Sequence, residues 1–131
     1  MVKDLAECRD VYDLLVCNVR PRPGMWARGG SLQELEAILF GYSVALEVHS
    51  MPEEFAFGAR GAFTQWLEST YGWGMSLGWA VAIEQHLQDG ETPMDAFFRL
   101  LDEYRATSNK SADHTGPFTR ANVRVVAGLR R

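Results

Sequence analysis

The sequence predicts an all-α fold, a single compact bundle of about five helices with a loosely ordered basic C-terminal tail. Apolar side chains recur every three or four residues in five separate segments, which is the spacing of an amphipathic helix. These segments are residues 3–18, 32–49, 59–70, 76–88 and 92–106. The last segment, residues 120–131, could be a short helix or a strand, but no second convincing strand exists to pair with it.

The chain is predicted to form one domain over residues 1–131. Its 131 residues are 47% hydrophobic and 11% aromatic, which is enough for one sizeable core and too few for two comfortable ones. We expect this core within about residues 3–106. Residues 107–131 follow as a polar loop and a basic tail, because the composition there turns to Thr, Ser, Asn and Lys and then to Arg.

The first helix is expected over residues 3–18. Its apolar positions are separated by acidic side chains, which favour the N-terminal end of a helix dipole. It ends before Pro21, because the residue before a proline disfavours helical backbone angles. Cys8 and Cys17 both fall on this helix, on opposite faces and too far apart for a disulfide, so we expect two buried thiols.

The segment Arg20–Trp26 has the sequence Arg-Pro-Arg-Pro-Gly-Met-Trp. The packing of a core alone does not explain this composition. Pro21 and Pro23 fix their own backbone angles and push the residues before them, Arg20 and Arg22, into extended conformations. The sequence therefore predicts a stiff, polyproline-like arm that presents two guanidinium groups.

The second helix, residues 32–49, carries the best start signal in the chain. Ser31 is followed three residues later by Glu34, which is a capping box: the hydroxyl accepts from the first turn and the carboxylate reaches back. Gly41 lies inside this helix and costs about 1 kcal/mol of helix propensity relative to alanine. We expect Gly41 to allow the close approach of another helix.

The later helices are separated by turn residues. A loop over residues 50–58 precedes the third helix, and Ser76 is expected to cap the fourth. Gly90 is expected to end the fourth helix in the left-handed conformation. Thr92 and Pro93 then start the fifth helix, as its N-cap and its first helical residue.

The charge is distributed unevenly along the chain. Residues 1–110 contain nine Lys and Arg against sixteen Asp and Glu, a net charge of −7. Residues 111–131 contain four Arg against one Asp, a net charge of +3. An acidic body of this kind argues against nucleic-acid binding and favours basic partners.

The sequence offers no motif for catalysis or for binding a metal or cofactor. Its three histidines are scattered, and its two cysteines do not form a Cys-x-x-Cys pair. No HExxH motif, phosphate-binding glycine loop or nucleophile elbow is present. We therefore predict that the protein is not an enzyme, with no catalytic residue, no metal site and no cofactor.

Hydropathy argues against a membrane protein. No apolar run approaches the roughly 18 residues needed to cross a bilayer. The first residues, Met-Val-Lys-Asp, lead into no apolar segment of the kind found in a signal peptide. We expect the protein in the cytoplasm, without a membrane partner.

Two of the four tryptophans are candidates for contact with a partner. Trp66 and Trp79 fall inside predicted helices, where the core is the expected place for the ring. Trp26 and Trp73 fall in loops near glycines, where a large ring is harder to bury. A loop tryptophan brings much contact area at a small entropic cost, so it makes a good interface anchor.

Several motifs between about residues 20 and 105 resemble one family. They are an Arg-Pro-Gly-Met segment, a Ser-Leu helix start, a Leu-to-Gly-Tyr helix, a Phe-x-x-Trp-Leu helix and a closing Phe-Phe-x-Leu-Leu-Asp-Glu-Tyr. In this chain they are Arg22–Met25, Ser31–Leu32, Leu35–Tyr42, Phe63–Leu67 and Phe97–Tyr104. Together they resemble small bacterial immunity proteins of polymorphic toxin and contact-dependent inhibition systems. The resemblance implies binding rather than catalysis.

We therefore expect a bacterial protein that neutralises a cognate toxin domain, of a basic nuclease type, by forming a stoichiometric complex. The candidate contact residues are Arg20, Arg22, Trp26, Glu47, Glu53, Glu54 and Trp73. Two alternatives remain open. One is another interaction or regulatory module. The other is a small enzyme that holds an anionic substrate with Arg20 and Arg22 in a deep pocket, beside an acid such as Glu84.

Overall fold

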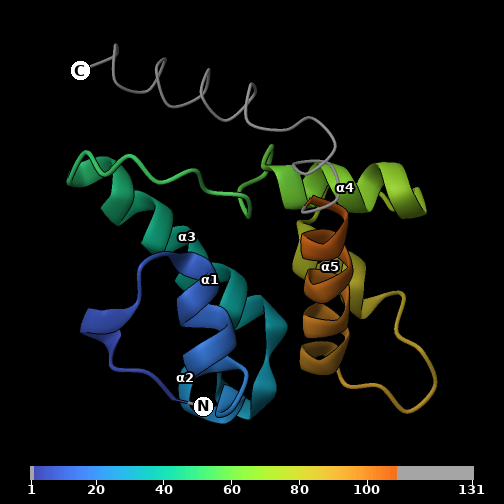
Figure 1. Cartoon of the computed structure of the whole chain (residues 1–131). Helices are drawn as coiled ribbons and strands as arrows, with labels where there is room; N and C mark the ends of the chain where they lie inside the picture. Colours follow the sequence, from blue (N-terminus) through green and yellow to red (C-terminus); the bar gives the residue numbers. More distant parts are fainter. Residues whose placement is uncertain (1, 109–131) are drawn as a thin grey trace. The chain divides into compact units, whose positions relative to one another are not determined.

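The computed structural model describes residues 2–108 and confirms the all-α fold class (Figure 1). Within these residues the regular secondary structure is helical, and no strand occurs. The chain divides into two compact units, residues 1–99 and residues 100–131. The single domain expected from the sequence stays a prediction. The predicted basic tail lies outside the described residues, as does the predicted polar loop from residue 109 on.

The first predicted helix begins later than expected. Asp10 starts it, because its side chain accepts a hydrogen bond from the backbone N–H of Asp13 at 3.0 Å. Cys8 therefore lies before the helix, and Cys8 and Cys17 are half-buried free thiols instead of two residues of one helix. The elements here are a 3-10 turn η1 (Leu5–Glu7), α1 (Val11–Leu14) and a π-helical turn η2 (Leu15–Val19).

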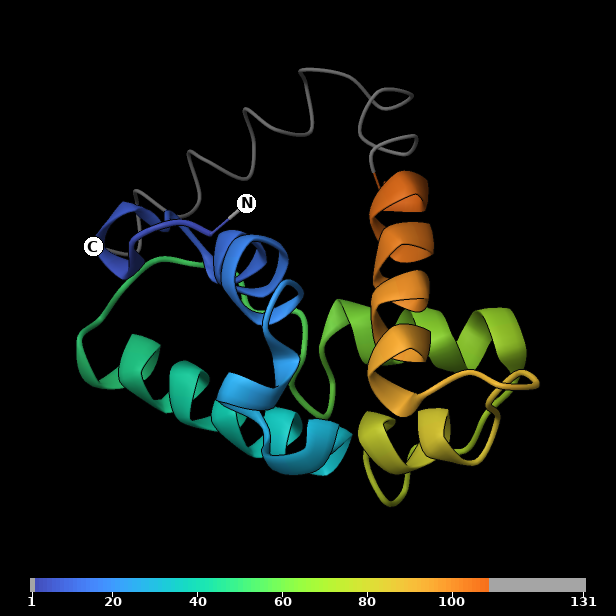
Figure 2. The ribbon, with the colours of Figure 1, turned by 90° about the horizontal axis from the view of Figure 1, so that it is seen from below.

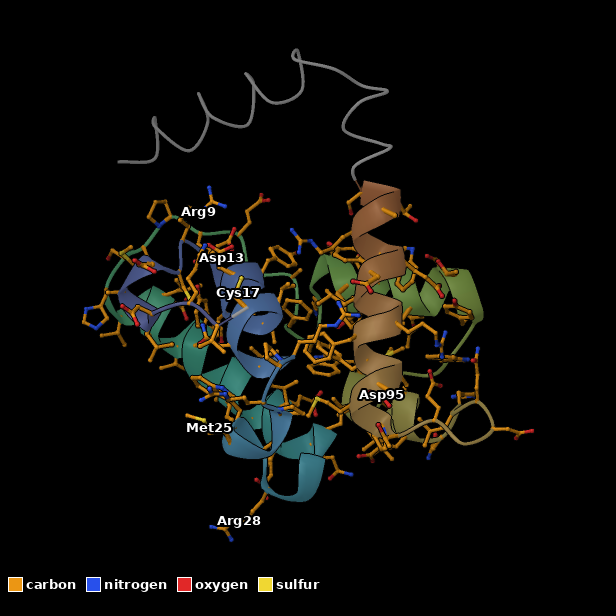
Figure 3. The ribbon with its side chains drawn as sticks, turned by 60° about the horizontal axis from the view of Figure 1, so that its bottom comes forward. Arg9, Asp13, Cys17, Met25, Arg28 and Asp95 are labelled. Atoms are coloured by element: carbon orange, nitrogen blue, oxygen red, sulfur yellow. The ribbon has the colours of Figure 1, made fainter. Side chains whose placement is uncertain are left out.

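Asp13 ties this N-terminal segment together. Its Oδ2 atom accepts hydrogen bonds from the backbone N–H of Arg9 at 2.9 Å and from Arg9 Nε at 3.2 Å, and it lies 3.2 Å from Lys3 Nζ. Figure 3 shows Arg9 and Asp13 close together on this part of the ribbon. These donors, the Arg9 backbone first, lower the pKa of Asp13 to about 2.

We predict that Asp13→Asn lowers the melting temperature at pH 6 and that this effect fades in acid. A folded-state pKa below the unfolded value of about 3.9 means that the ionised carboxylate stabilises the fold. The contribution is complete above pH 4 and is lost as the pH falls through about 2. Thermal unfolding of the variant and the wild type from pH 6 to pH 2 measures the difference. Asp4→Asn, at an exposed acid nearby, is the control, and a pH-independent difference for Asp13→Asn would contradict the assignment.

The predicted extended arm at Arg20–Trp26 is wrong. Arg20 has helical angles (φ −58°, ψ −46°), and its N–H donates to Leu15 O at 2.8 Å as the last turn of η2 closes. Pro23 then starts a short helix, because its fixed φ suits the first helical position. The chain forms two short helical turns here, α2 (Pro23–Trp26) and the 3-10 turn η3 (Arg28–Gly30).

The second predicted helix is confirmed as α3, Leu32–Val48. Ser31 caps it, with Oγ accepting from the N–H of Glu34 at 3.2 Å. The other half of the predicted capping box differs: Glu34 Oε1 accepts from the N–H of Arg28 at 2.9 Å, because the turn η3 brings that donor within reach. Gly41 faces open space among the described residues, so no helix of this part of the chain approaches it closely.

The later helices keep the predicted order with shifted ends. Gly78, with φ +93°, occupies the N-cap position that we expected for Ser76, so the fourth predicted helix starts later and is shorter. The fifth predicted helix is confirmed: Thr92 Oγ1 accepts from the N–H of Asp95 at 3.1 Å. The elements are α4 (Ala62–Tyr71), α5 (Trp79–Glu84) and a helix over residues 93–108.

After α3 the chain turns back and runs along this helix toward α4 (Figures 1 and 2). This returning segment, residues 49–61, contributes Phe57 to the middle of the core, where the side chain is 4% exposed. Trp79 Nε1 donates to the carbonyl oxygen of Phe57 at 2.9 Å, which satisfies the buried indole. The rings around Phe57, at centroid distances of 5.2 to 6.2 Å, belong to Tyr12, Phe55, Phe63, Trp79 and Phe97.

Among the described residues, no helix combines the length and the apolar character that a membrane crossing requires.

Candidate functional site

A pocket of about 440 Å³ lies between α3, the returning segment and the residues that lead into α5. Four aromatic rings form its walls, and its polar lining includes one acidic side chain, Glu36. Among the described residues that line the pocket, none is Lys, Arg or His. The lining residues are Gln33, Glu36, Ala37, Phe40, Ser43, Phe55, Phe57, Ala59, Thr64, Met75, Ser76, Gly78 and Trp79.

Glu36 joins α3 to the start of α5 inside this pocket. Its carboxylate accepts hydrogen bonds from the backbone N–H groups of Ala80 and Trp79, which are free donors at the first turn of α5. Burial raises the pKa of Glu36; the two N–H groups oppose this, and the nearby Glu84 adds to the rise. Two acidic side chains, Glu36 and Glu84, therefore lie near each other at this end of the pocket.

Gly78 makes the approach of Glu36 possible. A Cβ atom at residue 78 would lie 2.6 Å from Glu36 Oε2, and the φ of +93° is one that side chains rarely adopt. The backbone angle at residue 78 therefore favours glycine, and a Cβ atom there would displace the Glu36 carboxylate.

The outer face of α3 is apolar and exposed. Phe40, Val44 and Val48 recur at four-residue intervals, so they share one face of the helix, and Met51 follows just beyond its end. Their exposed fractions are 69%, 42%, 70% and 56% respectively. We call these four residues the α3 apolar surface. Phe40 also lines the pocket, so the pocket and the α3 apolar surface meet at this ring.

Charge on α3 has one sign. Its sequence contains three glutamates, Glu34, Glu36 and Glu47, and no Lys or Arg. Glu47 is exposed and lies three residues after Val44, so it flanks this face of the helix. The apolar face therefore lies beside negative charge. It is complementary to a partner surface that has an apolar centre with positive charges around it.

The predicted contact residues do not gather in one place. Arg20, Arg22 and Trp26 precede the start of α3, and Glu47 lies at its other end; a helix of this length spans roughly 25 Å. Figure 3 shows Met25 and Arg28 pointing outward from the ribbon in the region before α3. The predicted set is therefore divided between the two ends of α3, with Trp73 on a separate segment between α4 and α5.

The arginine pair lies outside the pocket beside α3, and the alternative of a small enzyme stays a prediction. Arg20 and Arg22 are exposed, and neither lines the pocket beside α3, nor does Glu84. The Arg20 guanidinium lies instead 5.2 Å from the ring centroid of Phe98, a cation–π contact within the protein. Trp26 is half-buried in α2.

The three predicted acids have different surroundings. Glu47 and Glu54 are exposed, whereas both oxygens of Glu53 bond within the protein. Glu53 Oε2 accepts from the N–H of Val11 at 2.9 Å, and Oε1 accepts from the hydroxyl of Tyr42 at 2.6 Å. Burial raises the pKa of Tyr42, and the Glu53 carboxylate adds to this rise. Glu53 therefore fastens the start of α1 and the middle of α3 to the returning segment.

We predict that Glu53→Ala lowers the free energy of unfolding by about 1 to 3 kcal/mol, because it leaves the Val11 N–H and the Tyr42 hydroxyl without their charged acceptor. Urea unfolding followed by circular dichroism measures the change. Glu54→Ala removes an adjacent exposed acid and is expected to stay within about 0.5 kcal/mol of the wild type. Equal stability of the two variants would contradict a structural role for Glu53.

Trp73 is held by neighbouring rings. It stacks on His86 at a centroid distance of 4.4 Å and on Tyr71 at 4.7 Å, while His86 Nδ1 lies 2.8 Å from the carbonyl oxygen of Ala82. Because a carbonyl only accepts, this contact places the proton of a neutral His86 on Nδ1. The ring of Trp73 is thus fixed but half-exposed, and its role as an anchor for a partner stays a prediction.

No group of three or more His, Cys, Asp or Glu side chains that could hold a metal ion occurs among residues 2–108.

Sequence reasoning missed the pocket, and the signals for it were weak. In the sequence, Glu36 occupies an ordinary polar position of an amphipathic helix. Phe55 and Phe57 lie in a segment that was predicted to be a loop. The Leu-Gly-Trp sequence before α5 could have indicated a backbone turn that admits a close contact. Nothing in it names Glu36 as the partner.

Comparison with known proteins gives no match. No protein-family model matches the chain, and no curated protein or solved structure matches it.

Proposed function

We propose that this chain is a bacterial protein-binding protein that neutralises a cognate toxin domain of a basic, nuclease type by forming a stoichiometric complex in the cytoplasm. The α3 apolar surface is the observation that carries the binding function. Exposed contiguous apolar side chains on a helix face are typical of sites that pack against another protein. The toxin as partner rests on the resemblance of the sequence motifs to immunity proteins.

The charge supports a basic partner. Residues 1–110 carry nine basic against sixteen acidic side chains, and α3 carries acidic side chains alone. An acidic inhibitor surface steers a cationic partner to it and can cover the basic active site of an enzyme that acts on nucleic acid. The apolar side chains then provide the buried centre that slows dissociation.

The contact face in this proposal is the outer face of α3 with Glu47, together with the exposed Glu54. Glu53 is left out of this face because both of its carboxylate oxygens accept hydrogen bonds within the fold, and its contact with a partner stays a prediction. Arg20, Arg22, Trp26 and Trp73 remain candidates for a second contact region.

Co-expression with the product of the neighbouring gene tests the proposal. We expect a stable one-to-one complex whose partner is basic and toxic when it is produced alone. Val48→Asp introduces a charge into the α3 apolar surface and is expected to weaken the complex by roughly tenfold or more. Leu5→Asp, at another exposed apolar residue, is the control.

Charge reversal tests the electrostatic part separately. Glu47→Lys is expected to slow association and to reduce the salt dependence of binding, whereas Glu68→Lys on α4 is expected to change both less. A chain that elutes alone and protects against no neighbouring gene product would overturn the proposed function.

A further inference from the structure

The pocket beside α3 has the chemistry of a site for an organic cation. Four aromatic rings line it, Phe40, Phe55, Phe57 and Trp79, and aromatic rings attract guanidinium and ammonium groups to their faces. Its one acidic side chain is Glu36, and none of the described lining residues is a basic side chain that would pair with it. Aromatic walls with one uncompensated carboxylate are complementary to a cation with an apolar stem.

Glu36 has capacity for a further donor. A carboxylate accepts about four hydrogen bonds, and the backbone N–H groups of Ala80 and Trp79 are two donors to it. Gln33, which also lines the pocket and can donate, gives a hydrogen bond to Glu84 at 2.8 Å. A cation at Glu36 would also relieve its repulsion with Glu84.

The size and the position of the pocket suit a side chain of a partner that is bound at α3. A volume of about 440 Å³ is at the small end of ligand pockets, and it is ample for one long side chain. Phe40 belongs both to the pocket and to the α3 apolar surface. A protein seated on that surface would therefore have the pocket beside its contact face.

We propose that this pocket receives an arginine side chain of the basic partner, with the guanidinium against Glu36 and its plane against the aromatic walls. The inference rests on the proposed function, since it names the group by which the partner is held. Arginine is favoured over lysine because the guanidinium is planar, weakly hydrated and able to donate two parallel hydrogen bonds to one carboxylate.

The pocket can be tested on the full chain without the partner. The probe is N-acetyl-arginine methylamide, titrated while the indole N–H of Trp79 is followed by ¹⁵N NMR. This N–H donates to Phe57 O at 2.9 Å in the pocket wall, so it reports occupancy. We expect a saturable shift of its signal. The neutral analogue N-acetyl-citrulline methylamide is expected to bind at least tenfold more weakly, because it lacks the positive charge.

Two variants locate the probe. Glu36→Gln keeps an acceptor for the α5 amides and removes the charge, and it is expected to weaken the arginine probe by about tenfold. Glu47→Gln, on the same helix but outside the pocket, is the matched control. Should Glu36→Gln fail to fold, Phe40→Ala removes an exposed wall ring without disturbing the core and is expected to weaken the probe several-fold.

An unchanged Trp79 signal, equal binding of the citrulline analogue, or equal binding by the Glu36→Gln variant would each overturn the inference. The proposed function fails in a different way. A chain that binds the arginine probe but captures no toxic neighbour loses the function and keeps the pocket as a cation site. A neutralising complex that Glu36→Gln leaves equally tight keeps the function and overturns the pocket as its anchor.

Discussion

Replacing Phe57 by alanine is expected to lower the free energy of unfolding by about 3 to 5 kcal/mol. The side chain is 4% exposed, and five aromatic rings surround it. Four of these rings come from helices before and after the returning segment and one, Phe55, from the segment itself, so they cannot all collapse into the space left by one phenyl group. A loss of this size is a large fraction of the 5 to 15 kcal/mol that stabilises a typical domain.

Urea unfolding at pH 7, followed by circular dichroism, measures the effect of Phe57→Ala. Phe40→Ala is the matched control, because the same atoms are removed from a ring that is 69% exposed; its effect is expected to stay within about 0.5 kcal/mol. Similar losses for both variants would mean that Phe57 is not the centre of the core.

Gly61→Ala is the second substitution with a large expected effect, a destabilisation of roughly 2 to 3 kcal/mol. A Cβ atom at residue 61 would overlap the backbone carbonyl of Ala56. That carbonyl accepts the N–H of Phe63 at 3.0 Å, and the Gly61 N–H donates to Gly58 O at 3.0 Å. Because the obstructing atoms are backbone, the turn must open and weaken these hydrogen bonds.

Gly41→Ala provides the matched control with the opposite sign. Gly41 lies inside α3 with no other part of the described chain within 4 Å of an added Cβ, so alanine is expected to stabilise the helix by about 0.5 to 1 kcal/mol. Thermal unfolding of the two variants compares them directly. A stabilised Gly61→Ala variant would show that the turn before α4 tolerates a side chain.

Helix boundaries were predictable where a local signal sets them. Ser31 before α3 and Thr92 before the last described helix each accept the hydrogen bond that their spacing indicates. The prediction failed where tertiary contacts or alternative turns decide the backbone. Pro23 starts a helix instead of extending the chain, and Glu36 takes the role at the start of α5 that Ser76 was expected to have.

The candidate site was the least predictable part, because it depends on contacts distant in sequence. The spacing of Phe40, Val44 and Val48 indicates a helix face, but which face stays uncovered depends on what packs against α3. The same applies to Glu53: its position beside Glu54 suggests surface, whereas its carboxylate bonds Val11 and Tyr42. The local sequence pattern predicts the periodicity of a helix, but it does not predict which other elements pack against that helix.

The central position of Phe57 also has a consequence for folding kinetics. Helical proteins fold fast when their contacts are local in sequence, but here the ring at the centre joins Tyr12 of the first helix to Phe97 of the last described one. The core therefore needs two long loop closures before its contacts stabilise it. Folding should be slower than in an up-and-down helical bundle. During synthesis, the set of rings around Phe57 is completed only after residue 97 has left the ribosome.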